Sequence, residues 1–285
     1  MKLVTLATKN LIWVAPSDRV DKAICLMEEH GFHHLPVIEN GRVIGMLSDR
    51  DLLIAVGWKL EVERAVDGDP DSVIGPLQVR EIMSSPAISL SPDTDVHSAA
   101  RIMVNGKLHA FAIVKNDKPI GIVTSYDILK KVTGRSGPRT PAWLRRPVGR
   151  IMTTRLITIG PREPLHAAAR MLRENRVRHL PVTVDGALLG MITDRDIRRT
   201  CGQGAIEDAL AEERGAFYLG STQVIEVMSH EVVTATEGMT LLDACWRMVD
   251  RRIGSLPVCR GEIMVGMLTD SDLLRCIADA DDMGI

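Results

Sequence analysis

Aromatic residues are scarce in this sequence, and long apolar runs are absent from it. Phe, Trp and Tyr make up 3% of the 285 residues. No run approaches the ~18 apolar residues that a membrane-spanning helix needs, and residues 1–5 lack the long apolar stretch of a signal peptide. The sequence therefore predicts a cytoplasmic protein that is not associated with a membrane.

Paired cysteines and a strong excess of charge are also missing. The five cysteines show no Cys-x-x-Cys spacing, and Cys25 and Cys245 fall within apolar helical patterns, so we expect reduced thiols in the core. A net charge of −2 gives no support to bulk electrostatic binding of nucleic acid or anionic membrane. The 45% hydrophobic content is typical of a globular protein with apolar cores, and the length suits about two domains.

The usual signatures of catalysis are absent. The sequence contains no His-Glu-x-x-His phrase, no Ser or Cys nucleophile phrase and no Walker A loop. His33 and His34 with Asp49 or Asp51 could suggest a metal, but adjacent histidines on a strand point to opposite faces. We therefore expect neither an enzyme nor a metal site.

The chain contains four copies of a seven-residue motif. It runs Gly, two apolar residues, Thr or Ser, two further residues and Asp, and we call it the Gly-to-Asp phrase. Its four copies occupy residues 45–51, 121–127, 190–196 and 266–272. An apolar residue that opens a helical pattern stands 25 positions before each Gly, at Val20, Val96, Leu165 and Leu241. Offsets that hold over this span predict a repeat array.

The spacing of the copies predicts how the repeats are grouped. Successive Gly positions step by 76, 69 and 76, so copies one and three, and copies two and four, lie 145 residues apart. This suggests a pair of repeats that was duplicated as a pair. We expect a first module at residues 1–133, with repeats at about 1–56 and 79–133, a linker at 134–146, and a second module at 147–285, with repeats at about 147–201 and 223–280.

The second repeat shows the expected order of elements most clearly. Residues 87–90 predict a short strand, and apolar residues recurring from Val96 predict a helix with one apolar face. Residues 111–114 and 119–123 predict two strands around a turn, and Thr124 opens a second helix. Each repeat is thus predicted as an α/β (α+β) unit of the form βαββα. About fifty residues have too little core to stand alone, so we expect two copies to pack sheet to sheet.

The predicted linker is basic and rich in Pro and Gly. No acidic residue interrupts the basic positions in and around it, which are Lys130, Lys131, Arg135, Arg139, Arg145, Arg146 and Arg150. This composition is typical of a stiff, exposed linker. A contact to nucleic acid or phosphate is the alternative function of the same run, although nucleic acid is the less favoured partner.

These features resemble the CBS domain, the repeat named after cystathionine beta-synthase. The Gly-to-Asp phrase lies at a fixed offset from a Leu-Pro-Val strand in three copies and from Phe111-Ala112-Ile113 in copy two. The resemblance covers nearly the whole chain and implies four CBS motifs that pair into two tandem Bateman modules, stacked as a disk. It also implies a non-catalytic regulatory protein that binds AMP, ADP, ATP or S-adenosylmethionine between paired repeats and signals occupancy to an enzyme, channel or transporter.

The resemblance also assigns candidate ribose and phosphate contacts. In each Gly-to-Asp phrase the carboxylate would accept hydrogen bonds from the ribose hydroxyls, and the Ser or Thr hydroxyl would contact ribose or phosphate. The residues are Ser48, Asp51, Thr124, Asp127, Thr193, Asp196, Thr269 and Asp272. Their Ser/Thr-x-x-Asp spacing equally suits a helix cap. A Glu would reach further back to the cap amide, yet all four are Asp, which favours ligand contact.

Basic residues just before the Leu-Pro-Val strand are the candidate phosphate ligands. They are His33, His34, His109, Arg178 and His179. Copy four has the uncharged Gly254 and Ser255 at this position, so copies one and three are the best candidate sites. Because His titrates near neutrality, affinity for a polyphosphate should rise as pH falls. Adenine is expected against apolar residues of the first strands, which would be core in any case. These are Ile12, Ile88, Ile157 and Val233.

Besides nucleic-acid binding through the basic linker, two functions remain open on the sequence alone. As a ligand sensor, the protein would bind an adenine nucleotide as its regulatory ligand and need no other cofactor. Occupancy would then shift the relative setting of the two modules toward a form that an unidentified protein target binds better. As a scaffold, it would hold a partner constitutively, and its clefts would be vestigial. A homodimer is compatible with either function.

Overall fold

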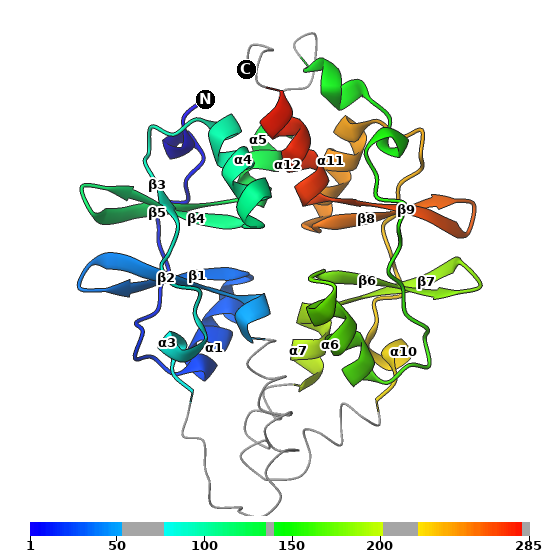
Figure 1. Ribbon diagram of the computed structural model, residues 1–285, viewed down its shortest axis with the longest axis horizontal. Coiled ribbons are helices and arrows are strands. Elements are labelled where there is room, and N and C mark those ends of the chain that lie inside the picture. The colour runs from blue at the N-terminus through cyan, green and yellow to red at the C-terminus, as the bar shows by residue number, and fades with distance from the viewer. Residues whose placement is uncertain (53–76, 135–139, 202–221, 281–285) are drawn as a thin grey trace, which may run out of the picture.

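The computed structural model describes residues 1–52, 77–134, 140–201 and 222–280. Four repeats lie around a common centre in the spatial order 1, 2, 4, 3 (Figure 1). The hairpins of repeats 1 and 2 lie one above the other on one side, and those of repeats 3 and 4 on the other side (Figure 1). This is the predicted α/β arrangement of paired repeats.

Repeats 1 and 2 share a helix, a two-stranded hairpin and a following helix in that order, and repeat 2 has a short strand before them. Repeat 1 contains α1 (Val20–His30), β1 (His34–Glu39) and β2 (Arg42–Ser48), and residues 49–52 begin another helix. Repeat 2 contains β3 (Ser89–Leu90), α4 (Val96–Gly106), β4 (Ala110–Lys115), β5 (Lys118–Thr124) and α5 (Ser125–Thr133).

Repeats 3 and 4 follow the same order. Repeat 3 contains α6 (Leu165–Glu174), β6 (His179–Val184), β7 (Ala187–Thr193) and α7 (Asp194–Cys201). Repeat 4 contains α11 (Leu241–Arg251), β8 (Ser255–Arg260), β9 (Ile263–Thr269) and α12 (Asp270–Asp279). Helices α1, α4, α6 and α11 begin at the apolar residues that open the helical patterns, so the predicted helix starts are confirmed.

The first strand of each repeat is shorter than the sequence pattern predicts. In repeat 2 it is β3, whose two residues pair in parallel with β4. In the other repeats it is reduced to one parallel bridge, joining Val14 to Val37, Ile159 to Val182 and Ala235 to Val258. The strand is short because the chain just before it pairs with the partner repeat instead.

The segment that precedes each repeat packs on the other repeat of its pair, and we call these the leading segments. Reciprocal backbone hydrogen bonds of 2.8–3.1 Å join Thr8 to Ile122, Ser84 to Met46, Thr153 to Met267 and Ser229 to Met191. The short helices η1 (Leu3–Thr5), α3 (Val79–Ile82), η3 (Val148–Arg150) and α10 (Val224–Val227) belong to these segments. The repeats of a pair are therefore interlocked.

This close crossing explains the Gly of the Gly-to-Asp phrase. A Cβ on Gly121 would lie 2.8 Å from the carbonyl oxygen of Thr8, and one on Gly190 would lie 2.9 Å from that of Ser229. A Cβ on Gly45 would lie 2.6 Å from Met83 Sδ and 3.1 Å from the Ser84 carbonyl oxygen. One on Gly266 would lie still closer to Met152 Sδ, again in a leading segment. A side chain would push the leading segment off the strand, so the glycine is required by the crossing of two backbones.

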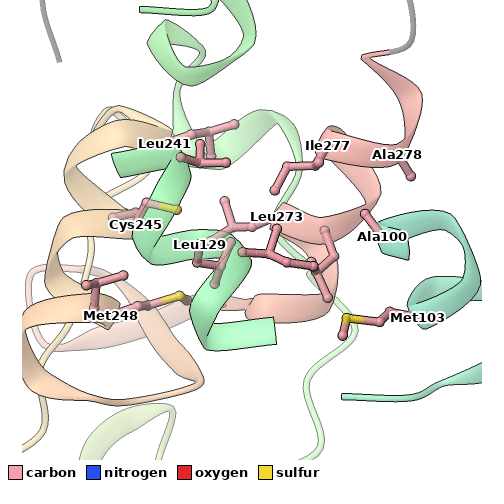
Figure 2. Close-up of a cluster of buried hydrophobic side chains, with 14 of the residues drawn as sticks. Ala100, Met103, Leu129, Leu241, Cys245, Met248, Leu273, Ile277 and Ala278 are labelled. Carbon is pink, nitrogen blue, oxygen red and sulfur yellow. The ribbon is translucent and has the colours of Figure 1, made fainter. Parts of the chain in front are cut away.

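The largest apolar core lies between repeats 2 and 4 and therefore joins the two modules. Helices α4 and α5 pack against α11 and α12. Figure 2 shows buried side chains of this core, among them Ala100, Met103, Leu129, Leu241, Cys245, Met248, Leu273, Ile277 and Ala278. Repeats 1 and 3 have smaller cores of their own. The sequence predicted sheet-to-sheet packing within each module. It did not predict this core of helices between the two modules.

The predicted exposed linker is partly buried. Residues 135–139 lie outside the described part of the chain. In η2 (Ala142–Arg145), Trp143 and Leu144 are 3% and 0% exposed and belong to the core between repeats 2 and 4. Arg145 and Arg146 are exposed. The prediction of a wholly exposed linker is therefore wrong, because two apolar side chains fix the segment to the helices.

The two cysteines predicted to be core residues differ. Cys245 is buried in α11, as predicted. The prediction for Cys25 is wrong, because it is exposed on α1 while Ala23, Ile24 and Met27 form the buried face of that helix.

Among the described residues, none of the helices combines the length and apolarity that crossing a bilayer requires.

Candidate functional site

The Ser or Thr and the Asp of every Gly-to-Asp phrase cap the start of a helix. In each copy Asp Oδ2 accepts a hydrogen bond of 2.8–2.9 Å from the backbone N–H of the Ser or Thr three residues earlier. The same oxygen accepts a bond of 2.6–2.8 Å from that residue's hydroxyl. Asp therefore closes the box despite its shorter side chain, because the extended cap residue brings its amide within reach, so Asp in place of Glu does not by itself indicate ligand contact.

The cap leaves the second carboxylate oxygen, Oδ1, in a different state from copy to copy. Within the described residues, Oδ1 of Asp127 and of Asp196 has no hydrogen-bond partner. Oδ1 of Asp51 accepts a bond of 3.3 Å from the Ser84 hydroxyl, and Oδ1 of Asp272 lies 3.3 Å from the Arg275 guanidinium. The cap thus holds four carboxylates in one orientation, each with an oxygen that the cap does not use.

A leading segment of the partner repeat crosses each of the four Gly-to-Asp phrases. Ser84, which contacts Asp51, belongs to the leading segment that crosses β2 at Met46. The corresponding crossings at β5, β7 and β9 place residues 8, 229 and 153 beside the other three phrases. Burial raises the pKa of Asp51, although the hydrogen bonds from Ser48 and Ser84 oppose that rise. The four candidate sites therefore lie between the paired repeats, two in each module.

The five predicted phosphate ligands come together at the centre, where all four repeats meet. They share this place with a residue of each repeat that directly follows the Ser or Thr of the Gly-to-Asp phrase. The central cluster consists of His33, His34, Asp49, His109, Ser125, Arg178, His179, Asp194 and Asp270. Residues that the sequence suggested as ligands of separate copies thus form one group.

Hydrogen bonds within the central cluster cross from one module to the other. His109 Nδ1 and the Ser125 hydroxyl lie 3.1 and 2.8 Å from Oδ2 of Asp270, which joins repeat 2 to repeat 4. An Arg178 nitrogen lies 3.5 Å from Nε2 of His34, which joins repeat 3 to repeat 1. Polar and charged side chains of the two modules are therefore in direct contact at the centre.

Burial and charge decide which members of the central cluster are ionised. Burial opposes ionisation of Asp270, but the hydrogen bond and charge of His109 and the hydrogen bond of Ser125 hold its pKa well below the ordinary value. Burial lowers the pKa of His34, and the positive charge of Arg178 lowers it further. Burial likewise lowers the pKa of His179 to about 4, against the opposing charge of Asp270. Two imidazoles are therefore neutral at pH 7.

The acidic side of the central cluster was not among the predicted site residues. Asp49, Asp194 and Asp270 stand one residue after the Ser or Thr of their phrases, and Ser125 takes that place in repeat 2. Burial raises the pKa of Asp194. The Oδ2 atom of Asp49 lies 2.5 Å from His33 Nδ1. An acid at the same position in three of four copies was the sequence signal that could have identified them.

The predicted adenine walls are not all core residues. Ile12, Ile157 and Val233 are partly buried and pack against their cores. Ile88 is 47% exposed, so its assignment to the core is wrong.

A cavity of about 410 Å³ borders Asp272. Its wall is formed by α12 and by the segment that joins the modules. The lining residues are Trp143, Arg146, Ile151, Asp272, Arg275, Cys276, Asp279 and Ala280. This cavity belongs to copy four, whereas the sequence favoured copies one and three as the best candidate sites. In the part of the chain that the structure describes, no three His, Cys, Asp or Glu side chains are grouped to hold a metal ion.

Comparison with known proteins identifies the repeat. The CBS domain profile matches residues 4–57, 79–134, 148–202 and 224–279. MJ1404, an uncharacterized protein of Methanocaldococcus jannaschii, is 29% identical over 278 residues. The match covers 95% of this chain, which spans 61% of the length of MJ1404. MJ1225 of the same organism is 25% identical over 276 residues, covering 95% of this chain and 96% of MJ1225.

Solved structures share the whole fold. The crystal structure of MJ1225, which is proposed to be an archaeal homologue of γ-AMPK, matches with a TM-score of 0.84 at 25% identity. The match covers 98% of this chain and 100% of that one. An uncharacterized conserved protein from Pyrococcus horikoshii matches with a TM-score of 0.65 at 20% identity, covering 97% and 100% of the two chains.

Proposed function

This chain belongs to the CBS domain family, and we propose that it is a non-catalytic regulatory protein that binds adenosine nucleotides of the AMP, ADP or ATP class. The nucleotides bind in the clefts beside the four Gly-to-Asp phrases. The observation that carries the proposal is the fixed carboxylate of each phrase, which has one oxygen in a helix cap and the other outside it. A ribose hydroxyl can donate a hydrogen bond to this oxygen outside the cap.

The central cluster supports the phosphate end of the proposed ligand. His33, His109 and Arg178 place imidazole and guanidinium donors at the meeting point of the repeats. A phosphate requires positive charge or N–H donors. A nucleotide whose ribose lies at a phrase and whose phosphate points inward therefore contacts groups from more than one repeat.

This geometry gives occupancy a way to act on the whole molecule. The contacts between His109 and Asp270 and between Arg178 and His34 join the two modules. A phosphate that competes for these donors binds one setting of the modules better than another, and such differential affinity shifts the population. A protein target that recognises the favoured setting would receive the signal.

Whole-chain similarity to MJ1225 is consistent with this function, since that protein is proposed to be a homologue of γ-AMPK. The similarity extends over both modules, so it includes the centre where they meet. We infer a regulatory role from it and leave the target unnamed.

The experiment is calorimetric titration of AMP, ADP and ATP into the wild type and into Asp51→Ala, Asp127→Ala, Asp196→Ala and Asp272→Ala. We expect binding to the wild type and the loss or weakening of a site in at least two of the variants. Asp243→Ala is the matched control, because Asp243 accepts a 2.6 Å bond from Thr240 in another Thr-x-x-Asp cap, outside the Gly-to-Asp phrases. This variant should be about 1 kcal/mol less stable because its cap is lost, but it should bind nucleotide as the wild type does.

Two results would contradict the proposal. If all four variants bound as the wild type does, the carboxylates would have only their capping role. If the wild type bound no nucleotide, the chain would instead be a scaffold with vestigial clefts.

A further inference from the structure

The cavity beside Asp272 is large enough for a ligand, but the carboxylate oxygen expected to bind a ribose already has a donor. The cavity volume of about 410 Å³ lies within the range of small-molecule sites. Oδ2 of Asp272 closes the helix cap with Thr269. Oδ1, the oxygen outside the cap, accepts a 3.3 Å hydrogen bond from the Arg275 guanidinium, which also lines the cavity. A ribose at copy four therefore has to replace Arg275.

The matching position in copy two holds a basic side chain that does not make this contact. Lys130 stands three residues after Asp127, as Arg275 stands three residues after Asp272. Lys130 is exposed, and among the described residues Oδ1 of Asp127 has no hydrogen-bond partner. The two copies have the same cap geometry, so the difference at Oδ1 comes from a residue that follows the Gly-to-Asp phrase.

The two members of the Arg275–Asp272 pair differ in their freedom to move. The Asp272 side chain is 8% exposed and is held by its cap, whereas the Arg275 side chain is 57% exposed. Ion pairs with an exposed partner contribute little free energy, so a ligand can displace this arginine into solvent. A ribose hydroxyl is a neutral donor, however, and the guanidinium makes a charge-assisted hydrogen bond, which is the stronger kind. Displacement therefore lowers the affinity of the cleft without abolishing binding.

We propose that Arg275 is a built-in competitor for the ribose at copy four. It occupies Oδ1 of Asp272 in the free protein, and a nucleotide binds this cleft only when Arg275 moves away from the carboxylate. The apparent affinity is then the intrinsic affinity multiplied by the fraction of molecules in which Arg275 is displaced. Arg275 thus sets the nucleotide concentration at which copy four is filled. This inference rests on the proposed function.

The test is calorimetric titration of AMP into the wild type, into Arg275→Met, and into Arg275→Met combined with Asp272→Ala. Met is a long side chain without a donor, so Arg275→Met leaves Oδ1 of Asp272 to the ligand. We expect the Asp272-dependent site to bind AMP about two- to fivefold more tightly, and the gain should be absent from the double variant. Loss of a positive charge would by itself weaken binding of an anionic nucleotide, so net charge cannot cause this gain.

Lys130→Met is the matched control, because it removes a positive charge at the same position of copy two without releasing a carboxylate oxygen. It should leave AMP affinity unchanged or lower. A gain in Arg275→Met that persists in the double variant, or an equal gain in Lys130→Met, would overturn the inference. If the wild type binds AMP and Arg275→Met binds no more tightly, the inference fails and the proposed function stands. If neither the wild type nor Arg275→Met binds AMP, both fail.

Discussion

The Gly and the Asp of the Gly-to-Asp phrase are fixed by different physical causes. The Gly lies where a leading segment crosses the strand, so its role is steric. The Asp closes a helix cap with one oxygen, so part of its role is structural as well. Only the oxygen outside the cap is left for a ligand. Repetition of a phrase is therefore evidence for the repeat, and the oxygen outside the cap is the evidence for a site.

We expect Gly190→Ala to destabilise the protein. Its Cβ would lie 2.9 Å from the carbonyl oxygen of Ser229, and relieving such an overlap typically costs about 1–3 kcal/mol. Urea denaturation measures the loss. Gly238→Ala is the control, because a Cβ there meets no atom within 4 Å. Equal stability of the two variants would show that the crossing does not require glycine.

The depressed pKa of His179 predicts acid sensitivity. Unfolded, this imidazole takes a proton near its ordinary pKa, whereas burial and the charge of Arg178 lower its folded pKa to about 4. The unfolded state therefore binds more protons between these values, and stability falls as pH falls through that window. We expect His179→Asn to reduce the stability lost between pH 7 and pH 5 by up to about 2 kcal/mol.

Urea denaturation at the two pH values checks this prediction. His30→Gln is a suitable control, since His30 lies in the last turn of α1, outside the central cluster. An unchanged pH dependence in His179→Asn would show that His179 is not held neutral by its surroundings.

At the scale of elements, local sequence patterns predicted where helices begin, but they did not predict contacts between segments that are distant in the sequence. Apolar periodicity identified the starts of α1, α4, α6 and α11, because a helix that buries one face must repeat its apolar residues. The first strands were predicted too long, since nothing local shows that the chain leaves to join the partner repeat. Trp143 was assigned to an exposed linker because its neighbours are Pro, Gly and Arg. Its burial depends on helices that are distant in sequence.

The helical core between repeats 2 and 4 should carry much of the stability. Leu273 of α12 is 0% exposed within this core. Truncating such a side chain leaves a cavity, and we expect Leu273→Ala to cost about 2–5 kcal/mol. Leu189→Ala is the control, because Leu189 is 41% exposed on β7. If urea denaturation gave similar losses for both, the two modules would not be joined through this core.

At the scale of the whole molecule, the candidate site is shared by all four repeats. The sequence indicated the basic members of the central cluster, because they stand just before the second strand of their repeats. It did not indicate that they would meet, since that depends on how two modules pack. The proposed phosphate contacts are thus also the contacts between modules, which is why ligand binding and module setting should be coupled.

This sharing predicts proton uptake on binding. His34 and His179 have lowered pKa values in the free protein, and a nearby phosphate would favour their protonated forms. The bound state then carries more protons, so affinity for ATP should rise as pH falls from 8 toward about 6.5. Calorimetry in buffers of different ionisation enthalpy measures the uptake directly. Binding heats that do not depend on the buffer would show that these imidazoles do not meet the phosphate.

The central claim, that the clefts bind adenosine nucleotides, is tested most directly by thermal unfolding of the wild type with increasing AMP. A ligand that binds only the folded state stabilises it, so the melting temperature should rise with AMP concentration. At a hundred times the dissociation constant, the free energy of unfolding should be higher by about 2.7 kcal/mol. Inorganic phosphate at equal ionic strength should produce a smaller shift. A melting temperature that stays constant with AMP, ADP and ATP would contradict the account.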